Sequence, residues 1–578
     1  KKDRDWFKAT GKLLVGDDIT VDLFRLMTLL ESSTGRFILL DDGTFLAITE
    51  ELKSRLEELN AYSTPHGDGL RFSPLAAPAM EELTDQAGSL ESDLAWKSHC
   101  SKLKETIHPK IPDTLKARLR DYQITGFNWL CRLAHWNVGA CLADDMGLGK
   151  TVQSLAAILV HASKGPTLVV APLSVMNNWE QECQNFAPGL NPLIFGGKDR
   201  QQLLDNLAPY DLVICSYGLL TIEAAKLSKV EWQTLVLDEA QAIKNRKAKR
   251  SKAAMKLKAH FRLITTGTPV ENRLDELWTL FNFLNPGLLG TYHRFKQMFI
   301  VPIEGHQDKE ASRHLRKLIR PFLLRRLKTE VLKELPEKTE ITLQVEMSRD
   351  EALLYEAQRL RSLEKINNAD DSAGQKQFQI LAELTKLRQL CCNPSLVLAD
   401  ADIESSKLKV FMDTVRELLE NQHKALVFSQ FVGHLTILRR ALDKEKISYQ
   451  YLDGSTPAKK RSERIDAFQN GRGDLFLISL KAGGTGLNLT AADYVIHMDP
   501  WWNPAVEDQA SDRAHRIGQT RPVTVYRLVV KDSIEERIVD LHKEKRDLAE
   551  SLLTGSEAAG KLSSVELLEL MQGKKQEH

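Results

Sequence analysis

The chain has 578 residues, more than one hydrophobic core usually supports, so we expect about four structural units. Hydrophobic residues make up 42% and charged residues 27% of the sequence, an ordinary balance for a globular protein that argues against general disorder. The 79 lysines and arginines nearly equal the 78 acidic residues, and the net charge of +1 excludes nucleic-acid binding through bulk charge. No apolar run approaches the roughly 20 residues of a membrane span.

The seven cysteines, at positions 100, 131, 141, 183, 215, 391 and 392, show no CxxC spacing and no partnered histidine pattern. Neither a zinc site nor a disulfide framework is indicated, so we expect reduced, buried thiols in a cytoplasmic protein. The sequence opens with KKDRDWF, without a secretory signal or an initiator methionine. We expect the natural protein to extend further toward its N-terminus.

The first elements are short strand-like runs. In RFILLDDGTFLAI, at 36–48, apolar stretches flank an Asp-Asp-Gly turn, which predicts a hairpin. Polar residues and helix formers prevail from 81 to 110, and Ile-Pro-Asp at 111–113 marks a boundary before a helix. Just beyond it, Gln123 in LRDYQ has an amide that can both donate to and accept from an adenine edge.

A glycine-rich turn, DDMGLGKT, occupies 144–151. Gly147 and Gly149 permit a tight turn whose N–H groups can hold phosphates, Lys150 adds a positive charge, and Thr151 offers a hydroxyl to Mg²⁺. The common GxxxxGK[ST] pattern has glycine at the position of Asp144. An accidental GKT in a glycine-rich turn is the alternative.

Short apolar runs then alternate with helical segments, at 167–173, 211–217, 234–240 and 262–268. Such runs predict buried parallel strands of an α/β sheet. The third ends in Asp238 and Glu239, which can hold Mg²⁺ through its water shell and polarise the attacking water. A solvated acidic loop is the alternative. The fourth leads into TTGTPVEN at 265–272, either a sensor of nucleotide state or a proline-containing turn.

From about 275 to 400 the apolar spacing becomes helical. One stripe joins Leu274, Leu277, Trp278 and Phe281, and a later one joins Leu381, Leu384, Leu387 and Leu390. Strand-like runs return at 424–431, 474–480, 493–500 and 524–530, which predicts a second parallel-sheet lobe.

The second lobe carries its own polar segments. SLKAGGTGLNLTAAD at 479–493 is a strand followed by a glycine-rich turn that could grip backbone phosphates. In QASDRAHRIGQ, at 509–519, we predict a helix that puts Arg513 and Arg516 one turn apart on one face. An exposed basic face is the alternative, although Gln509, Asp512 and Gln519 add polar anchors. For Trp501 and Trp502 we favour packing over base stacking.

Taken in order, these boxes resemble those of the Swi/Snf-type ATPases of helicase superfamily two. The resemblance covers about 112–550 and is carried by DDMGLGKT, LVLDEAQ, TTGTPVEN, ALVFSQF, AGGTGLNL, DPWWNP and RAHRIGQ. Asp145 stands where the family more often has Glu, and Gln241 replaces a frequent His without being expected to abolish activity. The implied fold is α/β, with two RecA-like parallel-sheet lobes and helical protrusions behind a small α+β accessory domain.

The resemblance also implies roles for residues. Hydrolysis would fall to Lys150, Thr151, Asp238, Glu239, Arg513 and Arg516. The ATP would lie beside Gln123, Asp145, Met146, Gly147, Leu148, Gly149, Lys150, Thr151 and Gly486, with Mg²⁺ on Thr151 and Asp238. DNA contacts that follow phosphate and sugar without reading bases would come from Pro172, Ser174, Ser216, Ser429, Gln430 and Thr485.

The expected units are an accessory module at 1–108, a first motor lobe at 109–330 with a helical insertion from about 275, a linker and helical protrusion at 331–400, a second lobe with a brace helix at 401–555, and a tail at 556–578. The module is similar to one that precedes the motor in bacterial members. We therefore expect a monomeric motor in the cytoplasm, associated with the nucleoid.

The function that the resemblance implies is a DNA-dependent ATPase that translocates on double-stranded DNA and remodels or displaces bound protein. Two alternatives stay open at this point. One is a strand-separating or RNA helicase. The other is a nucleotide-gated DNA-binding scaffold whose hydrolysis is suppressed by the N-terminal module.

Overall fold

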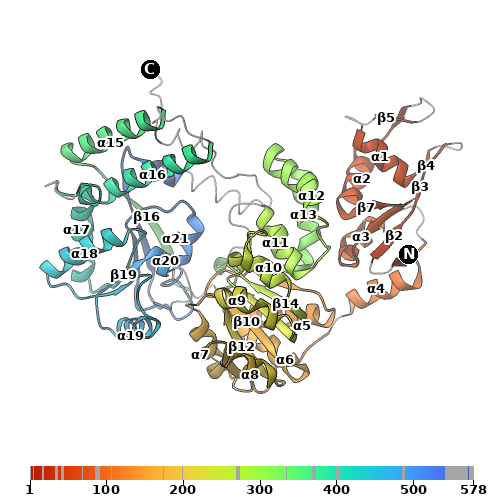
Figure 1. The fold of residues 1–578 in the computed structure, drawn as a ribbon, viewed down its shortest axis with the longest axis horizontal. Helices are drawn as coiled ribbons and strands as arrows, with labels where there is room; N and C mark the ends of the chain where they lie inside the picture. Colours follow the sequence, from red (N-terminus) through yellow and green to blue (C-terminus); the bar gives the residue numbers. More distant parts are fainter. Residues whose placement is uncertain are drawn as a thin grey trace. The chain divides into compact units, whose positions relative to one another are not determined.

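A computed structural model describes residues 2–540 except 4–5, 16–18, 33–36, 41–44, 68, 85–90, 106, 174, 198, 268–273, 333–334, 368–372, 399–402 and 484–487, and also describes residue 571. The chain forms two compact units (Figure 1). Among the described residues, the first unit joins 2–144 with 150–325, and the second joins Asp145–Gly149 with 326–540. Each unit is built around one parallel sheet.

The first unit begins with a small α+β region. Its main sheet is antiparallel, in the order β1-β2-β8-β7, and two hairpins, β3-β4 and β5-β6, stand beside it. The strands are β1 (Lys2–Asp3), β2 (Trp6–Ala9), β3 (Lys12–Val15), β4 (Ile19–Asp22), β5 (Phe37–Leu39), β6 (Phe45–Ala47), β7 (Ser63–His66) and β8 (Gly69–Phe72). The helices are α1 (Leu23–Ser32), α2 (Glu50–Tyr62), α3 (Ala77–Thr84) and α4 (Leu94–Lys104). The β5-β6 pair confirms the predicted hairpin, whose Asp-Asp-Gly turn lies outside the described residues.

This region is joined to the rest of the first unit by polar contacts with α12 (Tyr292–Phe295) and α13 (Lys309–Ile319). Lys317 of α13 forms an ion pair with Glu58 of α2 at 2.7 Å between Nζ and Oε1. The hydroxyl of Tyr62 donates to the carbonyl of His314 at 3.1 Å. Phe7, Tyr62 and Phe72 share a hydrophobic core with residues of α11 (Leu274–Leu284), α12 and α13. The small α+β region therefore packs on α11, α12 and α13.

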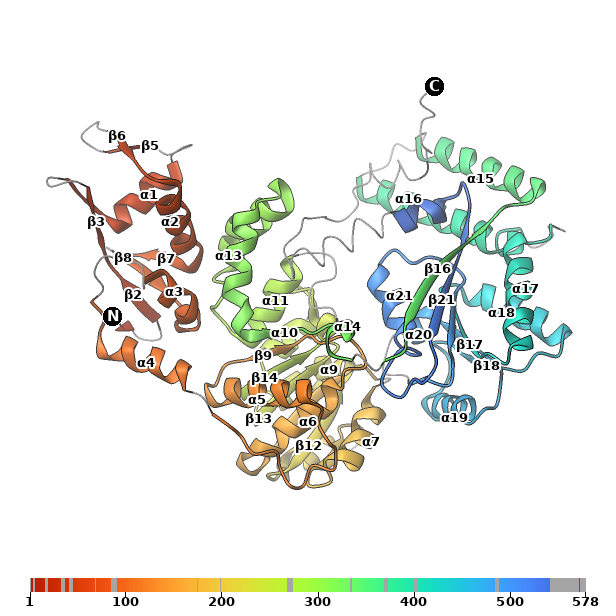
Figure 2. The same ribbon diagram turned by 180° about the vertical axis from the view of Figure 1, so that it is seen from behind.

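The sheet of the first lobe has seven strands within the described residues, all parallel, in the order β11-β12-β10-β13-β14-β9-β15. They are β9 (Ala140–Leu142), β10 (Thr167–Ala171), β11 (Asn191–Ile194), β12 (Asp211–Ser216), β13 (Glu231–Asp238), β14 (Lys258–Thr265) and β15 (Leu323–Leu324). Val169 and Val236 pack with helices α5 to α7 on one face, while Leu168 and Leu235 pack with α9 and α10 on the other. Figure 2 shows these helices around the strands of the sheet. These helices are α5 (Asp121–His135), α6 (Lys150–His161), α7 (Met176–Phe186), α8 (Arg200–Asp205), α9 (Tyr217–Leu227) and α10 (Lys249–Met255).

The second unit repeats this design with six parallel strands among its described residues, in the order β16-β21-β20-β17-β19-β18. They are β16 (Lys338–Val345), β17 (Ala425–Ser429), β18 (Tyr449–Leu452), β19 (Leu475–Ser479), β20 (Tyr494–His497) and β21 (Val523–Val530). Helices α14 (Lys328–Val331), α17 (Ser406–Glu420), α18 (Val432–Lys444), α19 (Ala458–Gln469), α20 (Leu480–Gly483) and α21 (Pro504–Ser511) connect or cover them. The prediction of two parallel-sheet lobes is confirmed.

Between the sheets the chain is mostly helical, as predicted, with α11 (Leu274–Leu284), α12, α13, α15 (Arg349–Asn367) and α16 (Ala373–Cys392). Leu274, Leu277 and Phe281 are buried, and so are Leu384, Leu387 and Leu390, but Leu381 is 42% exposed and stands outside its predicted stripe. The prediction is wrong at β15 and β16, which are strands. β16 lies at a sheet edge with most of its side chains exposed, so its sequence lacks the apolar run that marks a buried strand.

All seven cysteines lie among the described residues and are buried thiols, as predicted. Burial raises the pKa of the Cys131 thiol to about 12. Trp501 and Trp502 pack against the apolar clusters of the second unit, the arrangement that the sequence favoured over base stacking. No helix in the described part of the chain is long and apolar enough to cross a bilayer.

Candidate active site

Three loops follow neighbouring strands at the same edge of the parallel sheet of the first unit. The last residues of β9, β14 and β13 form one row, with Leu142 beside Thr265 and Thr265 beside Asp238. The N–H of Thr266 donates to the carbonyl of Leu142 at 3.2 Å and ties two of these loops together. Ligands of open α/β sheets bind at the carboxyl ends of the strands. The glycine-rich turn after β9 and the acidic pair after β13 therefore open on the side where a ligand is expected.

The glycine-rich turn has the backbone that a phosphate loop needs. Gly147 and Gly149 have φ angles of 87° and 75°, which residues with a Cβ adopt only at a cost. The turn runs into α6 at Lys150, and the first N–H groups of a helix attract anions. The Lys150 ammonium donates to the carbonyl of Asp144 at 2.6 Å. Asp144, at the usual glycine position, is fully buried and accepts a hydrogen bond from Gln153 at 3.3 Å.

Asp238 ends β13 and accepts hydrogen bonds on both carboxylate oxygens. Oδ2 accepts from the indole N–H of Trp179 at 2.8 Å, and Oδ1 accepts from the Thr265 hydroxyl at 2.6 Å and the Glu239 N–H at 3.0 Å. These three donors fix the carboxylate in one orientation. Nothing in the sequence pattern pointed to Trp179, which lies 59 residues away on α7.

Glu239 follows in a left-handed backbone conformation, with φ 48° and ψ 56°. A residue with a side chain rarely adopts this conformation, and such strain is typical of functional positions. Its Oε2 accepts from the Gln241 amide at 2.8 Å, and the Gln241 Oε1 accepts from the Thr266 hydroxyl at 3.2 Å. A continuous chain of hydrogen bonds thus joins Glu239, the candidate general base, to the loop after β14. For this loop the sequence left open a sensor of nucleotide state or a proline-containing turn. Residues 268–273 of that loop lie outside the described residues.

Replacing Thr265 with valine is expected to destabilise the first unit by about 1–3 kcal/mol and to lower ATP turnover, because Asp238 loses a buried donor. Thr234→Val is the matched control in the adjacent strand, since the Thr234 hydroxyl is buried without a hydrogen-bond partner among the described residues. Urea denaturation and steady-state turnover measure the two effects. Equal losses in both variants would contradict the role given to the Thr265 hydroxyl.

The other candidate residues of the first unit lie at the starts of helices or just after a strand, away from the hydrogen bonds of the acidic pair. Gln123 lies in the first turn of α5, where its Oε1 accepts from the Arg120 N–H at 3.0 Å. Ser216 caps α9 by accepting from the Leu219 N–H at 3.2 Å. Pro172 follows β10, at the same sheet edge as the acidic pair. Ser174 lies outside the described residues.

In the second unit, the prediction that Arg513 and Arg516 share one helix face is wrong. α21 ends at Ser511, and both arginines lie in the turns that follow it. The cause is Gln519, whose side-chain amide donates to the carbonyls of Thr490, Ala492 and Ala514 at 3.2, 2.8 and 3.1 Å and holds the segment against a neighbouring loop. Arg513 is 4% exposed, and Arg516 is partly exposed.

A buried ion pair that the sequence did not indicate stands beside these arginines. Lys328 pairs with Asp512 at 2.7 Å and donates to the carbonyl of His515 at 2.7 Å. Burial lowers the pKa of the Lys328 ammonium, while Asp512 acts in the opposite direction. Through this pair, the turn that contains both arginines is attached to Lys328, in the segment that precedes β16.

Ser429 is the last residue of β17, and Gln430 follows it. The Ser429 hydroxyl is buried and donates to Oδ1 of Asp499, and the Gln430 N–H donates to Oδ2 of Asp499 at 3.1 Å. The side-chain Nε2 of Gln430 is buried without a hydrogen-bond partner among the described residues. Thr485 and Gly486, and residues 541–553 of the expected brace helix, lie outside the described residues.

The residues present fit a magnesium ion. Mg²⁺ takes oxygen ligands and keeps several of its waters, so a carboxylate with spare acceptor positions suits it. Asp238 keeps such capacity because its oxygens accept three hydrogen bonds in all. Thr151 offers a hydroxyl in the first turn of α6, immediately after Lys150.

Comparison with known proteins gives two adjoining family matches. Residues 122–396 match the SNF2-related domain, and residues 406–518 match the helicase conserved C-terminal domain. The glycine-rich turn and the acidic pair fall within the first match, and Ser429, Gln430 and both arginines fall within the second.

Among similar proteins, a Bacillus subtilis protein named as an ATP-dependent helicase/translocase, YwqA, is 40% identical over 478 residues, covering 80% of this chain and 51% of its own length. The human SWI/SNF-related matrix-associated actin-dependent regulator of chromatin subfamily A member 1 is 36% identical over 481 residues, covering 78% of this chain and 46% of its own. A solved structure, the Sulfolobus solfataricus SWI2/SNF2 ATPase core in complex with dsDNA, is 36% identical, covers 81% of this chain and 97% of that one, and has a TM-score of 0.40. The chain spans about half the length of the curated relatives it matches.

Proposed function

Because this chain belongs to the Swi/Snf-type ATPases of helicase superfamily two, we propose that it hydrolyses ATP and uses the energy to translocate on double-stranded DNA and to remodel or displace bound protein. The observation that carries the proposal is the row of strand ends Leu142, Thr265 and Asp238. This row supports the proposal, because the glycine-rich turn, the acidic pair and the two threonines Thr265 and Thr266 all lie at one edge of one sheet. Each is a part that phosphoryl transfer requires.

In the proposed reaction, the N–H groups of the phosphate loop and the Lys150 ammonium bind the phosphates. The hydrogen bond from Lys150 to the Asp144 carbonyl shows that this ammonium reaches back over the loop, where it can exchange a carbonyl oxygen for a phosphate oxygen. Mg²⁺, held by Thr151 and through water by Asp238, would neutralise phosphate charge when bound. Glu239 takes the proton of the attacking water, and its hydrogen bond with Gln241 orients the carboxylate.

Arg513 and Arg516 would supply positive charge to the γ-phosphate as arginine fingers. Their turn is anchored by the Gln519 amide, which donates to three carbonyls, and by the Lys328–Asp512 ion pair. A rigid turn is suited to this role because the charge then needs no reorganisation at the moment of reaction. The sequence predicted a helix that carries both guanidinium groups, but this role does not require one.

The DNA contacts that we propose follow the backbone rather than the bases. Pro172 and Ser216 lie at the carboxyl edge of the first sheet, and Gln430 lies at that of the second. Gln430 is a candidate donor to a phosphate oxygen, because its Nε2 has no acceptor among the described residues. This nitrogen is buried, so the side chain would turn outward to reach DNA. Ser429 would act indirectly, since its hydroxyl is committed to Asp499. Local donors of this kind account for DNA binding at a net charge of +1.

The proposal is tested by measuring ATP turnover with and without duplex DNA, together with displacement of a triplex-forming third strand. We expect duplex DNA to raise turnover severalfold and the third strand to be released only with ATP. Release of one duplex strand in an unwinding assay would favour a strand-separating helicase. High-affinity duplex binding with no stimulation of turnover would favour the nucleotide-gated scaffold.

A further inference from the structure

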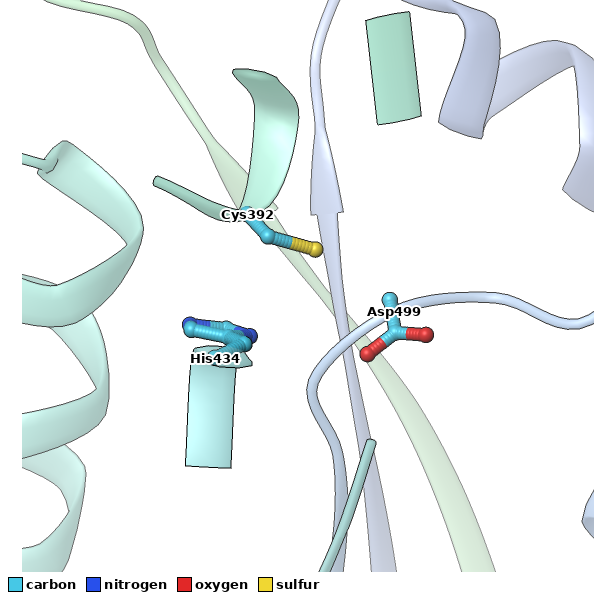
Figure 3. A group of neighbouring side chains, drawn as sticks. All are labelled: Cys392, His434 and Asp499. Atoms are coloured by element: carbon cyan, nitrogen blue, oxygen red, sulfur yellow. The ribbon is translucent and has the colours of Figure 1, made fainter. Parts of the chain in front are cut away.

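Three side chains that can ligate a metal meet in the interior of the second unit (Figure 3). Cys392 is the last residue of α16, His434 lies in the first turn of α18, and Asp499 follows β20. One donor atom from each lies within 4.8 Å of the others. Cys392 and His434 are fully buried, and Asp499 is 3% exposed. In Figure 3 the sulfur, the imidazole and the carboxylate converge on one space.

His434 is the most unusual member of this cluster. Neither of its ring nitrogens has a hydrogen-bond partner among the described residues, although the ring is 0% exposed. A buried polar group without a partner is costly and calls for an explanation such as a missing ion.

Asp499 adds a buried carboxylate that forms no ion pair among the described residues. Its oxygens accept from the Ser429 hydroxyl and the Gln430 N–H, which leaves further lone pairs on both oxygens. The nearby ammonium of Lys407 does not neutralise it, because Lys407 forms an ion pair with Glu535 at 2.6 Å. A thiolate from Cys392 together with the Asp499 carboxylate would give the site two negative charges, which a divalent cation balances.

We propose that Cys392, His434 and Asp499 bind a divalent zinc-type ion in the interior of the second unit. Sulfur, imidazole and carboxylate are the three ligand types of protein zinc sites, whereas Mg²⁺ and Ca²⁺ take oxygen ligands alone. Zinc–ligand bonds of about 2.0–2.3 Å place tetrahedral ligand atoms roughly 3.3–3.7 Å apart, so closure around the ion requires shifts of about an ångström. A water molecule completes the tetrahedron, and the proton of the Cys392 thiol leaves for solvent on binding.

The ion joins three segments that no sequence pattern connects. Ligands at 392, 434 and 499 are too widely spaced for any metal motif, which is why the sequence predicted no zinc site. Asp499 also accepts from the N–H of Gln430, a proposed DNA contact. Zinc bound here would therefore fix the loop after β17 as well as the end of α16. The role is structural and goes beyond the proposed ATPase cycle.

The test uses the full chain, stripped with a chelator and titrated with Zn²⁺ alone. We expect one zinc per chain by elemental analysis and a higher Tm with zinc than without. With Co²⁺ in place of zinc, a thiolate-to-cobalt absorption band should appear and should be lost in Cys392→Ser. The matched control is Cys391→Ser, the adjacent buried cysteine, which should keep both the band and the bound metal.

His434→Phe keeps the proposal falsifiable if the cysteine variant fails to fold. Phenylalanine retains a ring and removes two nitrogens that have no protein partner among the described residues, so the metal-free variant should be at least as stable as the native chain. Its zinc affinity should fall by about 100-fold or more. An equal zinc-induced rise in Tm for the variant and the native chain, or no zinc bound by the native chain, would overturn the proposal. Neither outcome depends on ATP turnover.

Discussion

Replacing Glu239 with glutamine is expected to lower ATP turnover by about 10²–10⁴-fold, the usual contribution of a general base. The change removes the ability to take a proton from water while keeping the size and shape of the side chain. The glutamine Oε1 can still accept the hydrogen bond that the Gln241 amide donates at 2.8 Å. The left-handed backbone and the three donors to Asp238 are untouched. We therefore expect nucleotide affinity and Tm to stay close to the native values.

The matched control for this variant is Glu231→Gln. Glu231 begins the same strand, β13, at the end of the sheet opposite the candidate site, and it is exposed. Turnover should be native in this control, with and without duplex DNA. If Glu239→Gln keeps native turnover while binding nucleotide normally, Glu239 is not the general base and the assignment of the acidic pair fails. Binding of a fluorescent nucleotide analogue separates a lost proton acceptor from a lost nucleotide site.

Buried elements were the predictable part of the fold. The apolar runs at 167–173 and 424–431 mark strands β10 and β17, because a parallel strand covered on both faces must be apolar along its whole length. β11 and β16 lack such runs because they lie at sheet edges, where polar side chains meet water. β9 is only three residues long, too short for a periodic signal.

In the candidate site, too, the residues in contiguous motifs could be predicted, whereas contacts between segments far apart in the sequence could not. Lys150 and Asp238 stand in contiguous motifs whose spacing carries the chemistry. Trp179 reaches Asp238 from another element, and a single tryptophan in a helix carries no mark of that contact. The helix predicted for the arginine segment is wrong because the Gln519 amide donates to the carbonyls of Thr490 and Ala492, in a loop more than 25 residues earlier in the chain. This tertiary interaction overrides the local helix propensity. The zinc ligands are likewise brought together only by the fold.

Replacing Lys407 with methionine is expected to destabilise the second unit by about 3–5 kcal/mol, the cost of leaving one partner of a buried ion pair behind. The Lys407 ammonium is fully buried, donates to both oxygens of Glu535 at 2.7 and 2.6 Å, and donates to the carbonyl of Met498 at 2.9 Å. In the variant, Glu535 still accepts the hydrogen bond that the Val530 N–H donates at 3.0 Å, but it has lost its cationic partner. A buried carboxylate in that state must take up a proton or draw in water.

The loss should appear as a lower urea midpoint and as hydrogen exchange in α17 that is faster by about a hundredfold or more. Arg416→Met on the same helix is the matched control, because Arg416 and Glu445 form an exposed pair at 2.6 Å that water and salt screen, and little change is expected. Adding Glu535→Leu to Lys407→Met should recover much of the stability, since replacing both partners leaves no charge unpaired. A double variant no more stable than Lys407→Met would show that packing around the lysine stem, and not its charge, holds α17 to the chain at 534–540.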